Sequence, residues 1–291
     1  MTARAPLALA ALLGGAATIG TSALFVKVSE AGPISTAFWR VCLALPVFFV
    51  WMWLEQRHRP QANIRSDGRM LAVVGLFFAA DLAFWHWSIV LTSVANATLL
   101  ANCAPIFVTL GVWIFLRQKP RPVFLGGLAT ALVGMALLVR GDFAHGGRAL
   151  LGDALGVATA LFYGSYQLSL SRARRTSSTA RIMAIGGAIS ALILLPIALL
   201  SGEQFMPSSA YGWLLLFGLA LLCQAAGQGL IAYAMAHLPA TFSSVGLLVQ
   251  PVVAAALAWV LLGEALTALA IAGGVLVLVG IRVAHGAERD A

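Results

Sequence analysis

Ten apolar segments follow one another along this chain, and each is long enough to cross a bilayer as a helix. Only 10% of the 291 residues are charged, against roughly 25% in a soluble domain, so lipid must replace water around most of the surface. Lipid offers open backbone groups no partner, and the alternating pattern of a barrel is missing, so helices are required. We therefore predict an all-α integral membrane protein with ten transmembrane helices at residues 7–26, 34–54, 70–91, 95–116, 123–139, 150–170, 182–200, 211–233, 241–262 and 265–283.

The basic residues favour one side of the membrane. With the first segment entering from inside, 14 of the 18 Lys and Arg residues fall on inner segments, and Lys27, Arg140 and Arg148 fall on outer ones. Arg40 lies within the second span. The positive-inside rule therefore places both termini in the cytoplasm. Topology and attraction of anionic lipid explain the basic clusters better than substrate handling does, and their scatter over short loops argues against nucleic-acid binding.

The two halves of the chain match each other at a fixed offset of 146 residues. The matches are Pro105 with Pro251, Trp113 with Trp259, Gly127 with Gly273 and Gly134 with Gly280. We interpret residues 1–145 and 146–291 as two repeats of five helices. Because five is odd, the second copy must enter the bilayer upside down. Inverted repeats are a recurrent design of secondary transporters, which hold substrate near the midplane, so we expect a central cavity between the halves.

Five short stretches give the chain a resemblance to the EamA family of the drug/metabolite transporter superfamily. They are residues 22–27 (SALFVK), 37–40 (AFWR), 103–107 (CAPIF), 247–253 (LLVQPVV) and 261–266 (LLGEAL). The first half departs from the family pattern at Arg117 and Gln118, where Gly-Glu is usual. The resemblance implies ten helices, a central cavity and export of small metabolites or amino acids. In length and layout the chain is most similar to bacterial amino-acid exporters, including the YddG type for aromatic amino acids. This resemblance implies that the protein lies in the inner membrane of a bacterium.

Asp81 is the only acidic residue deep inside a span, where a carboxylate costs roughly 2.5–3.5 kcal/mol on insertion scales. Helical spacing puts it on one face with Phe77, Trp85, Ser88 and Thr92. We expect it either to bind a substrate ammonium group or exchange a proton, or to form an ion pair with Arg40 that fixes the third span to the second. His86 is a second candidate for proton coupling, although a lone helix histidine more often serves packing.

Polar stripes run along the fourth, sixth, eighth and ninth spans, and deep aromatic residues lie beside them. We predict that they face a shared interior, with substrate-binding residues Phe78, Asp81, Trp85, Asn102, Tyr163, Tyr166, Gln167, Gln224, Gln228, Ser243 and Gln250. The aromatic members would suit an aromatic or apolar side chain. The alternative is that the polar groups join helices by hydrogen bonds and that the aromatic rings serve ordinary packing.

Proline interrupts the fourth and ninth spans. Pro105 and Pro251 remove a backbone donor, which frees the carbonyls of Ala101 and Leu247 and bends the helix. Interrupted helices in both halves point to a binding site, so we predict that these prolines act as hinges; static kinks that improve packing are the alternative. The fifth and tenth spans have glycines at helix-packing spacing and are expected to form a scaffold, with Gly126, Gly127, Gly134, Gly273, Gly274 and Gly280.

Several kinds of site are missing from the sequence. It has no G-x-x-x-x-G-K-[ST] loop for ATP, and nothing at metal-ligand spacing beside His86. Cys42, Cys103 and Cys223 lie in apolar segments without a C-x-x-C pair, so we expect them to pack. An enzyme acting on lipid would need clustered carboxylates, a metal set or a nucleophile with its base. We predict no enzymatic activity, no metal and no cofactor.

The leading hypothesis is a secondary transporter that exports amino acids, with aromatic ones as one option, or similar small metabolites by alternating access. Its expected partners are a small-molecule substrate and the lipid bilayer, and two complete halves would allow it to work as a monomer. A multidrug or other metabolite carrier of the same fold is the alternative. A non-transporting scaffold is a third hypothesis, which predicts that the polar stripes pair and leave no cavity.

Overall fold

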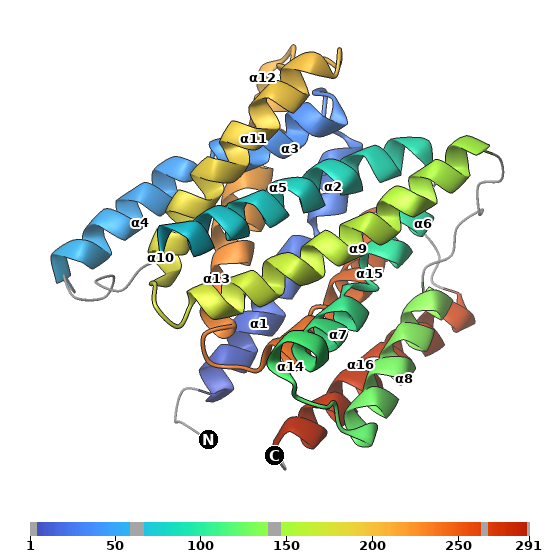
Figure 1. Ribbon diagram of the computed structural model, residues 1–291. Coiled ribbons are helices and arrows are strands. Elements are labelled where there is room, and N and C mark those ends of the chain that lie inside the picture. The colour runs from blue at the N-terminus through green and yellow to red at the C-terminus, as the bar shows by residue number, and fades with distance from the viewer. Residues whose placement is uncertain (1–4, 59–66, 93, 139–146, 263–266, 290–291) are drawn as a thin grey trace.

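The computed structural model describes residues 5–58, 67–92, 94–138, 147–262 and 267–289, and every regular element in these ranges is a helix (Figure 1). The predicted boundary at residues 145 and 146 lies outside the described residues. The elements are α1 (Ala5–Gly20), α2 (Ser22–Lys27), α3 (Pro33–Cys42), α4 (Leu45–His58), α5 (Gly68–Leu91), α6 (Val94–Ala101), α7 (Ala104–Leu116), α8 (Pro122–Leu138), α9 (Gly147–Ala173), α10 (Thr179–Arg181), the π-helical η2 (Ile182–Gly186), α11 (Gly187–Leu200), α12 (Ala210–Gly218), the π-helical η3 (Leu219–Gln228), α13 (Gly229–Ala234), α14 (Ala240–Gly246), α15 (Val249–Leu262) and α16 (Ala268–Arg289).

Eight helical segments within the described ranges are long and apolar enough to cross a membrane. They correspond to eight of the predicted spans and confirm a multi-pass membrane protein. The other two predicted spans coincide with α8, which has 17 residues, and with α9, which has 27 residues and contains Asp153, Tyr166 and Gln167. Ten crossings therefore stays a prediction.

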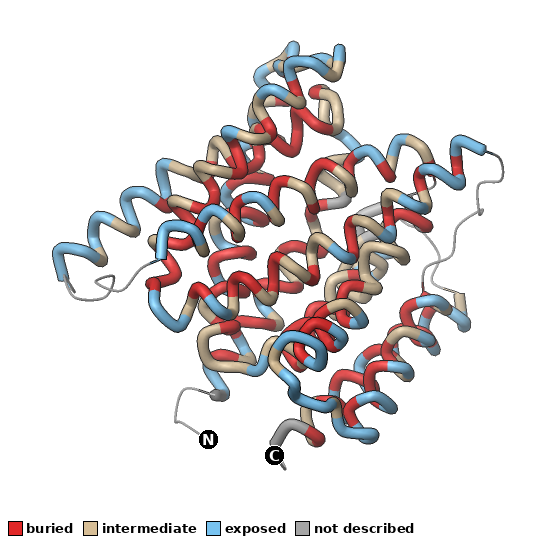
Figure 2. The backbone as a smooth tube through the Cα atoms, in the orientation of Figure 1, coloured by how far each residue is buried: buried red, intermediate tan, exposed pale blue. Residues whose placement is uncertain are grey.

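Exposed residues follow the outward-facing stretches of the helices (Figure 2), and many of them have large apolar side chains. Leu200 is 86% exposed, Phe115 is 74% exposed and Leu150 is 72% exposed. Water would penalise so much exposed apolar area, whereas acyl chains do not. The distribution fits helices that are surrounded by lipid.

Short breaks precede the two prolines that we expect to act as hinges. Between α6 and α7, Cys103 N donates to Leu100 O at 3.0 Å, and between α14 and α15, Leu248 N donates to Val245 O at 3.0 Å. These bonds close tighter turns than the α-helical pattern. The Leu247 carbonyl, which Pro251 removes from its usual partner, accepts from Gln250 N at 2.9 Å. The interruptions are therefore confirmed, and hinge motion stays a prediction.

The pair α8 and α16 packs glycine against glycine along one edge of the molecule (Figure 1). A Cβ added at Gly134 would lie 2.6 Å from Gly273 O, and one at Gly127 would lie 2.8 Å from Gly280 O. Residue numbers thus fall from 134 to 127 along α8 while those of the contacting residues on α16 rise from 273 to 280. The two helices are therefore antiparallel. The predicted packing of these four glycines is confirmed, whereas Gly126 faces open space.

A polar cluster joins the connection between α2 and α3 to the connection between α11 and α12. The Glu30 carboxylate accepts hydrogen bonds from the backbone N–H and hydroxyl groups of Ser208 and Ser209. Glu203 Oε2 accepts from Ile34 N at 3.0 Å, and Gly32 N donates to Gln204 O at 2.8 Å. We call these residues the polar clamp. The hydrogen bond from the Ser209 hydroxyl is the main reason why the pKa of Glu30 is below its usual value.

Candidate functional site

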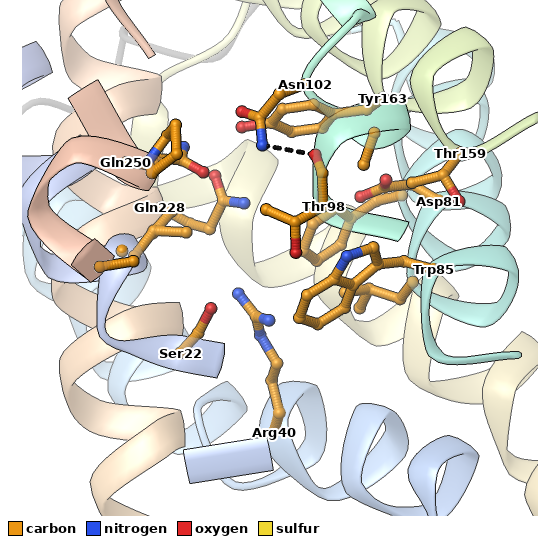
Figure 3. A pocket seen from close by; sticks show the side chains of 17 residues that line it. Ser22, Arg40, Asp81, Trp85, Thr98, Asn102, Thr159, Tyr163, Gln228 and Gln250 are labelled. Atoms are coloured by element: carbon orange, nitrogen blue, oxygen red, sulfur yellow. Dashed lines mark hydrogen bonds between the residues drawn. The ribbon is translucent and has the colours of Figure 1, made fainter. Parts of the chain in front are cut away.

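A central cavity of about 110 Å³ lies where helices from both halves of the chain meet (Figure 3). This volume is several times the roughly 10–15 Å³ that one water molecule needs. The polar and aromatic side chains that line it are Ser22, Arg40, Phe78, Asp81, Trp85, Thr98, Asn102, Thr159, Tyr163, Gln228 and Gln250. They come from α2, α3, α5, α6, the break after α6, α9, η3 and α15. Polar stripes that paired with one another would leave no such space, so the cavity argues against the scaffold hypothesis.

Asp81 lies near the middle of α5 with 8% of its surface exposed, on the cavity wall beside Thr159 (Figure 3). The described residues give its carboxylate no hydrogen bond, and the charge of Arg40 acts on it without a direct ion pair. Of the two roles predicted for Asp81, the ion pair with Arg40 is therefore not formed in this structure. Its position on the wall is the one that ligand binding or proton exchange requires.

Arg40 is the cation of the cavity, and the predicted substrate-binding set omitted it. It projects from α3 with 3% of its surface exposed, and its guanidinium points into the cavity (Figure 3). Its Nε donates to Gln224 Oε1 at 3.0 Å, which leaves the other N–H groups directed at the space. The sequence signal was present, because Arg40 is the one Lys or Arg deep within a predicted span, but it was interpreted only as a partner for Asp81.

Six other predicted residues line the cavity with Asp81, namely Phe78, Trp85, Asn102, Tyr163, Gln228 and Gln250, together with Pro251. Asn102 Nδ2 donates to Thr98 O at 2.8 Å. Gln228 Oε1 is buried and has no hydrogen-bond partner among the described residues, whereas the Gln250 side chain interacts with the Tyr163 hydroxyl. Buried amide groups are normally satisfied, so Gln228 presents a free acceptor to an occupant of the cavity.

Four predicted substrate-binding residues lie beside the cavity and not in its wall. Gln224 lies behind Arg40 and orients it. Tyr166 is buried between Phe78 and Tyr163, at ring-centroid distances of 4.8 Å and 6.2 Å. Gln167 and Ser243 are also buried, and their polar side-chain atoms have no hydrogen-bond partner within the described ranges.

Neither His86 nor Pro105 lines the cavity. His86 Nδ1 lies 2.7 Å from Leu82 O, and its ring packs edge-on against Trp85 with centroids 4.9 Å apart. The histidine therefore supports the wall from behind. Ser88 on α5 and Thr92, which follows the end of α5, donate to Gly152 O and Asp153 Oδ1 of α9 at 2.7 Å each.

Sequence reasoning also missed Ser22 and Thr159 as lining residues. Thr159 stands one helical turn before Tyr163, a spacing that could have identified it. The structure shows no group of three His, Cys, Asp or Glu that could hold a metal ion in the ranges that it describes.

Comparison with known proteins gives consistent matches over most of the chain. The EamA-like transporter family matches it twice, at residues 6–140 and 150–284. The pseudopaline exporter CntI of Pseudomonas aeruginosa is 26% identical over 269 residues, covering 92% of this chain and 93% of that one. A probable terminal-alkyne amino-acid exporter of Streptantibioticus cattleyicolor is 30% identical over 243 residues, covering 80% and 78%. A solved crystal structure has the same fold, with a TM-score of 0.79 over 99% of both chains at 18% identity.

Proposed function

Because this chain belongs to the EamA-like transporter family and is a small-molecule exporter, we propose that its cargo is a zwitterionic amino acid or a metabolite built on one. The proposal rests on the presence of two oppositely charged side chains in one small cavity. Asp81 and Arg40 both line it, and they do not neutralise each other by direct contact. In this proposal Asp81 binds the ammonium group of the cargo and Arg40 binds its carboxylate.

Electrostatics favours an occupant that carries both charges. A buried ion is costly unless it is paired and hydrogen-bonded, and charge-assisted hydrogen bonds are about twice as strong as neutral ones. A cation alone would leave the guanidinium of Arg40 unpaired, and an anion alone would leave the carboxylate of Asp81 unpaired. The free Oε1 of Gln228 supplies a further hydrogen bond to a polar cargo.

The aromatic wall supports an apolar or aromatic side chain on the cargo. Phe78, Trp85 and Tyr163 line the cavity beside the charged pair, and Tyr166 backs two of these rings. Aromatic rings favour offset-stacked or edge-to-face contacts with one another. An aromatic amino acid would combine these contacts with both charges, so we propose it as the preferred cargo.

We propose that transport proceeds by alternating access between two inverted five-helix repeats, residues 1–145 and 146–291. The antiparallel contact of α8 with α16, the fifth and tenth predicted helices, supports inversion because parallel repeats would give these helices the same direction. The breaks before Pro105 and Pro251 provide matching hinges in the two halves. In Figure 1, α1 begins and α16 ends near the same edge of the molecule, which supports ten crossings with both termini in the cytoplasm of a bacterium. We also propose that one chain suffices, since the cavity is complete within it.

Export from proteoliposomes tests the proposed cargo. The panel consists of phenylalanine, its decarboxylated amine phenethylamine and its N-acetyl derivative, each radiolabelled, with and without a pH gradient. We expect transport of phenylalanine only, because each analogue lacks one of the two charges. Asp81→Asn and Arg40→Gln should each lower phenylalanine transport at least tenfold.

Two results would contradict the proposal. Equal transport of phenethylamine and phenylalanine would remove the role of Arg40 and favour a multidrug carrier of cations. Unchanged transport and proton dependence in Asp81→Asn would make Asp81 a structural residue. Thr130→Val on α8, whose hydroxyl is exposed and bonds only to Gly126 O, is the control and should transport normally.

A further inference from the structure

A second cavity lies at the end of the molecule where α7 and α9 end and where α14 begins, and it is lined by basic side chains. Its volume is about 590 Å³, and its cations come from two separate connections: Lys119 and Arg121 before α8, and Arg174 and Arg175 after α9. The proposed topology places this end in the cytoplasm. We call this space the basic cavity.

Within the described ranges, few acidic groups lie near the basic cavity. The described lining residues include no Asp or Glu. Arg121 Nη1 donates to Ala287 O at 3.1 Å, and Arg174 Nη1 donates to Ser177 O, so two of the four cations are held in place by backbone carbonyls. Glu55, on α4, is the acidic group whose charge acts on Arg174, but it does not line the cavity. Arg174 Nε is buried without a hydrogen-bond partner among the described residues.

The basic cavity is distinct from the central cavity. Three helical segments, α6–α7, α9 and α14–α15, contribute lining residues to both cavities at different depths. The central cavity is lined by Asn102, Tyr163 and Gln250, and the basic cavity by Thr109, Ser171 and Thr241 of the same segments, respectively. At about 1.5 Å of rise per residue, each pair is separated by roughly 10–14 Å along its helix. The buried residues Gln167 and Ser243 lie in the layer between them.

We propose that the basic cavity binds an oxyanion, which is either the carboxylate of a soluble molecule or the phosphate of a lipid headgroup. Four cations that line one partly open cavity concentrate positive potential there. Guanidinium groups bind carboxylate and phosphate through paired N–H donors. The positive-inside rule requires only that basic residues lie in cytoplasmic segments near the ends of the spans. It does not require that these residues line one cavity. The neighbouring Arg117 and Arg172 lie in the same segments and do not line it, which offers a direct comparison.

The test compares two double variants that remove the same charge from the same segments. Lys119→Gln/Arg175→Gln removes two exposed cations of the basic cavity, and Arg117→Gln/Arg172→Gln removes two exposed cations outside it. The proteins are placed in phosphatidylcholine nanodiscs and titrated calorimetrically with citrate. In a second arm, phosphatidylglycerol that remains bound after purification from mixed lipid is quantified. Size-exclusion chromatography checks that both variants fold.

We expect at least one of these probes to bind the unmodified protein, with an affinity that falls as ionic strength rises. The double variant Lys119→Gln/Arg175→Gln should bind the probe at least tenfold more weakly than the unmodified protein. The double variant Arg117→Gln/Arg172→Gln should change the affinity less than twofold. Binding of citrate assigns the site to a soluble carboxylate, and retention of phosphatidylglycerol assigns it to a lipid headgroup. The proposal is wrong if neither probe binds, or if both pairs weaken binding equally. The proposal is also wrong if Arg40→Gln abolishes citrate binding, because the anion would then occupy the central cavity. Unchanged citrate binding in Arg40→Gln would show that the basic cavity binds the anion whether or not the proposed cargo is correct.

Discussion

Arg40 depends on one neighbour for its orientation. The hydrogen bond from its Nε to Gln224 Oε1 fixes the plane of the guanidinium and aims the remaining N–H groups at the cavity. A flexible arginine would lose conformational entropy each time it bound a carboxylate, whereas a guanidinium that is already held loses less. Gln224 therefore acts through Arg40 and is a positioning residue.

Replacing Gln224 tests this role. In Gln224→Leu the buried Nε has no acceptor, which costs about 1–3 kcal/mol, so we expect a lower melting temperature and a KM for cargo raised about tenfold. Gln224→Glu restores an acceptor but neutralises the guanidinium. It should recover the melting temperature while transport of carboxylate-bearing cargo stays impaired. If Gln224→Glu restored both, the residue would serve stability alone. Thermal unfolding and initial transport rates provide the two measurements.

The helices α8 and α16 pack closely against each other, and glycine makes this possible. Four glycines face the backbone of the partner helix, so the two axes approach more closely than helices with larger residues at these positions could. Close approach gives extensive van der Waals contact without any polar group in lipid. The pair contributes none of the residues that line the central cavity, which agrees with the predicted scaffold role.

Alanine at Gly134 should destabilise this pair. Its Cβ would lie 2.6 Å from Gly273 O, and overpacking of this kind costs about 1–3 kcal/mol. The control is Gly126→Ala on the same helix, where nothing lies within 4 Å of the new Cβ and where alanine improves helix propensity by about 0.5–1 kcal/mol. Thermal unfolding followed by size-exclusion fluorescence should show a lower melting temperature for Gly134→Ala and an equal or higher one for Gly126→Ala. Equal losses would show that the contact is looser than described.

The polar clamp links the two halves of the molecule at the end opposite the basic cavity. Gly212 permits its close approach, because a Cβ there would lie 2.5 Å from Glu30 Oε2. Ser209 contributes twice, since its hydroxyl donates to Glu30 and also accepts from Gly212 N at the start of α12. In the proposed alternating-access cycle this end would have to open and close, and the clamp would stabilise the arrangement of the halves seen here.

Acid should weaken the clamp. Hydrogen bonds to the carboxylate, with that from Ser209 the strongest, lower the pKa of Glu30 below its ordinary value of 4.5. The stabilisation is therefore fully present above about pH 4.5 and is lost as the pH falls through the lower pKa of the folded state. The melting temperature of the unmodified protein should drop more than that of Glu30→Gln between pH 7 and pH 3.5. Parallel curves for the two proteins would show that Glu30 does not couple to stability.

The sequence alone determined that lipid surrounds most of the protein and that its spanning segments are helices. Long apolar segments in a chain with little charge require helices in lipid, and the repeated Pro105 and Pro251 marked both helix breaks. It also identified Asp81, because an isolated carboxylate in an apolar helix is costly enough to need a reason. These inferences are local, since each depends only on residues near one another in the chain.

Only the tertiary structure decided which polar side chains meet. Helical periodicity gives the face on which a residue lies, but not the depth at which neighbouring helices close the space. Tyr163 and Gln167 share a face of α9, yet one lines the cavity and the other, about 6 Å further along the axis, is enclosed. Gln224 and Gln228 differ in the same way because η3, with wider turns than an α-helix, passes behind Arg40. Arg40 became a cavity residue only when α3 was packed against helices from the other half, a contact across 184 residues that no local pattern encodes.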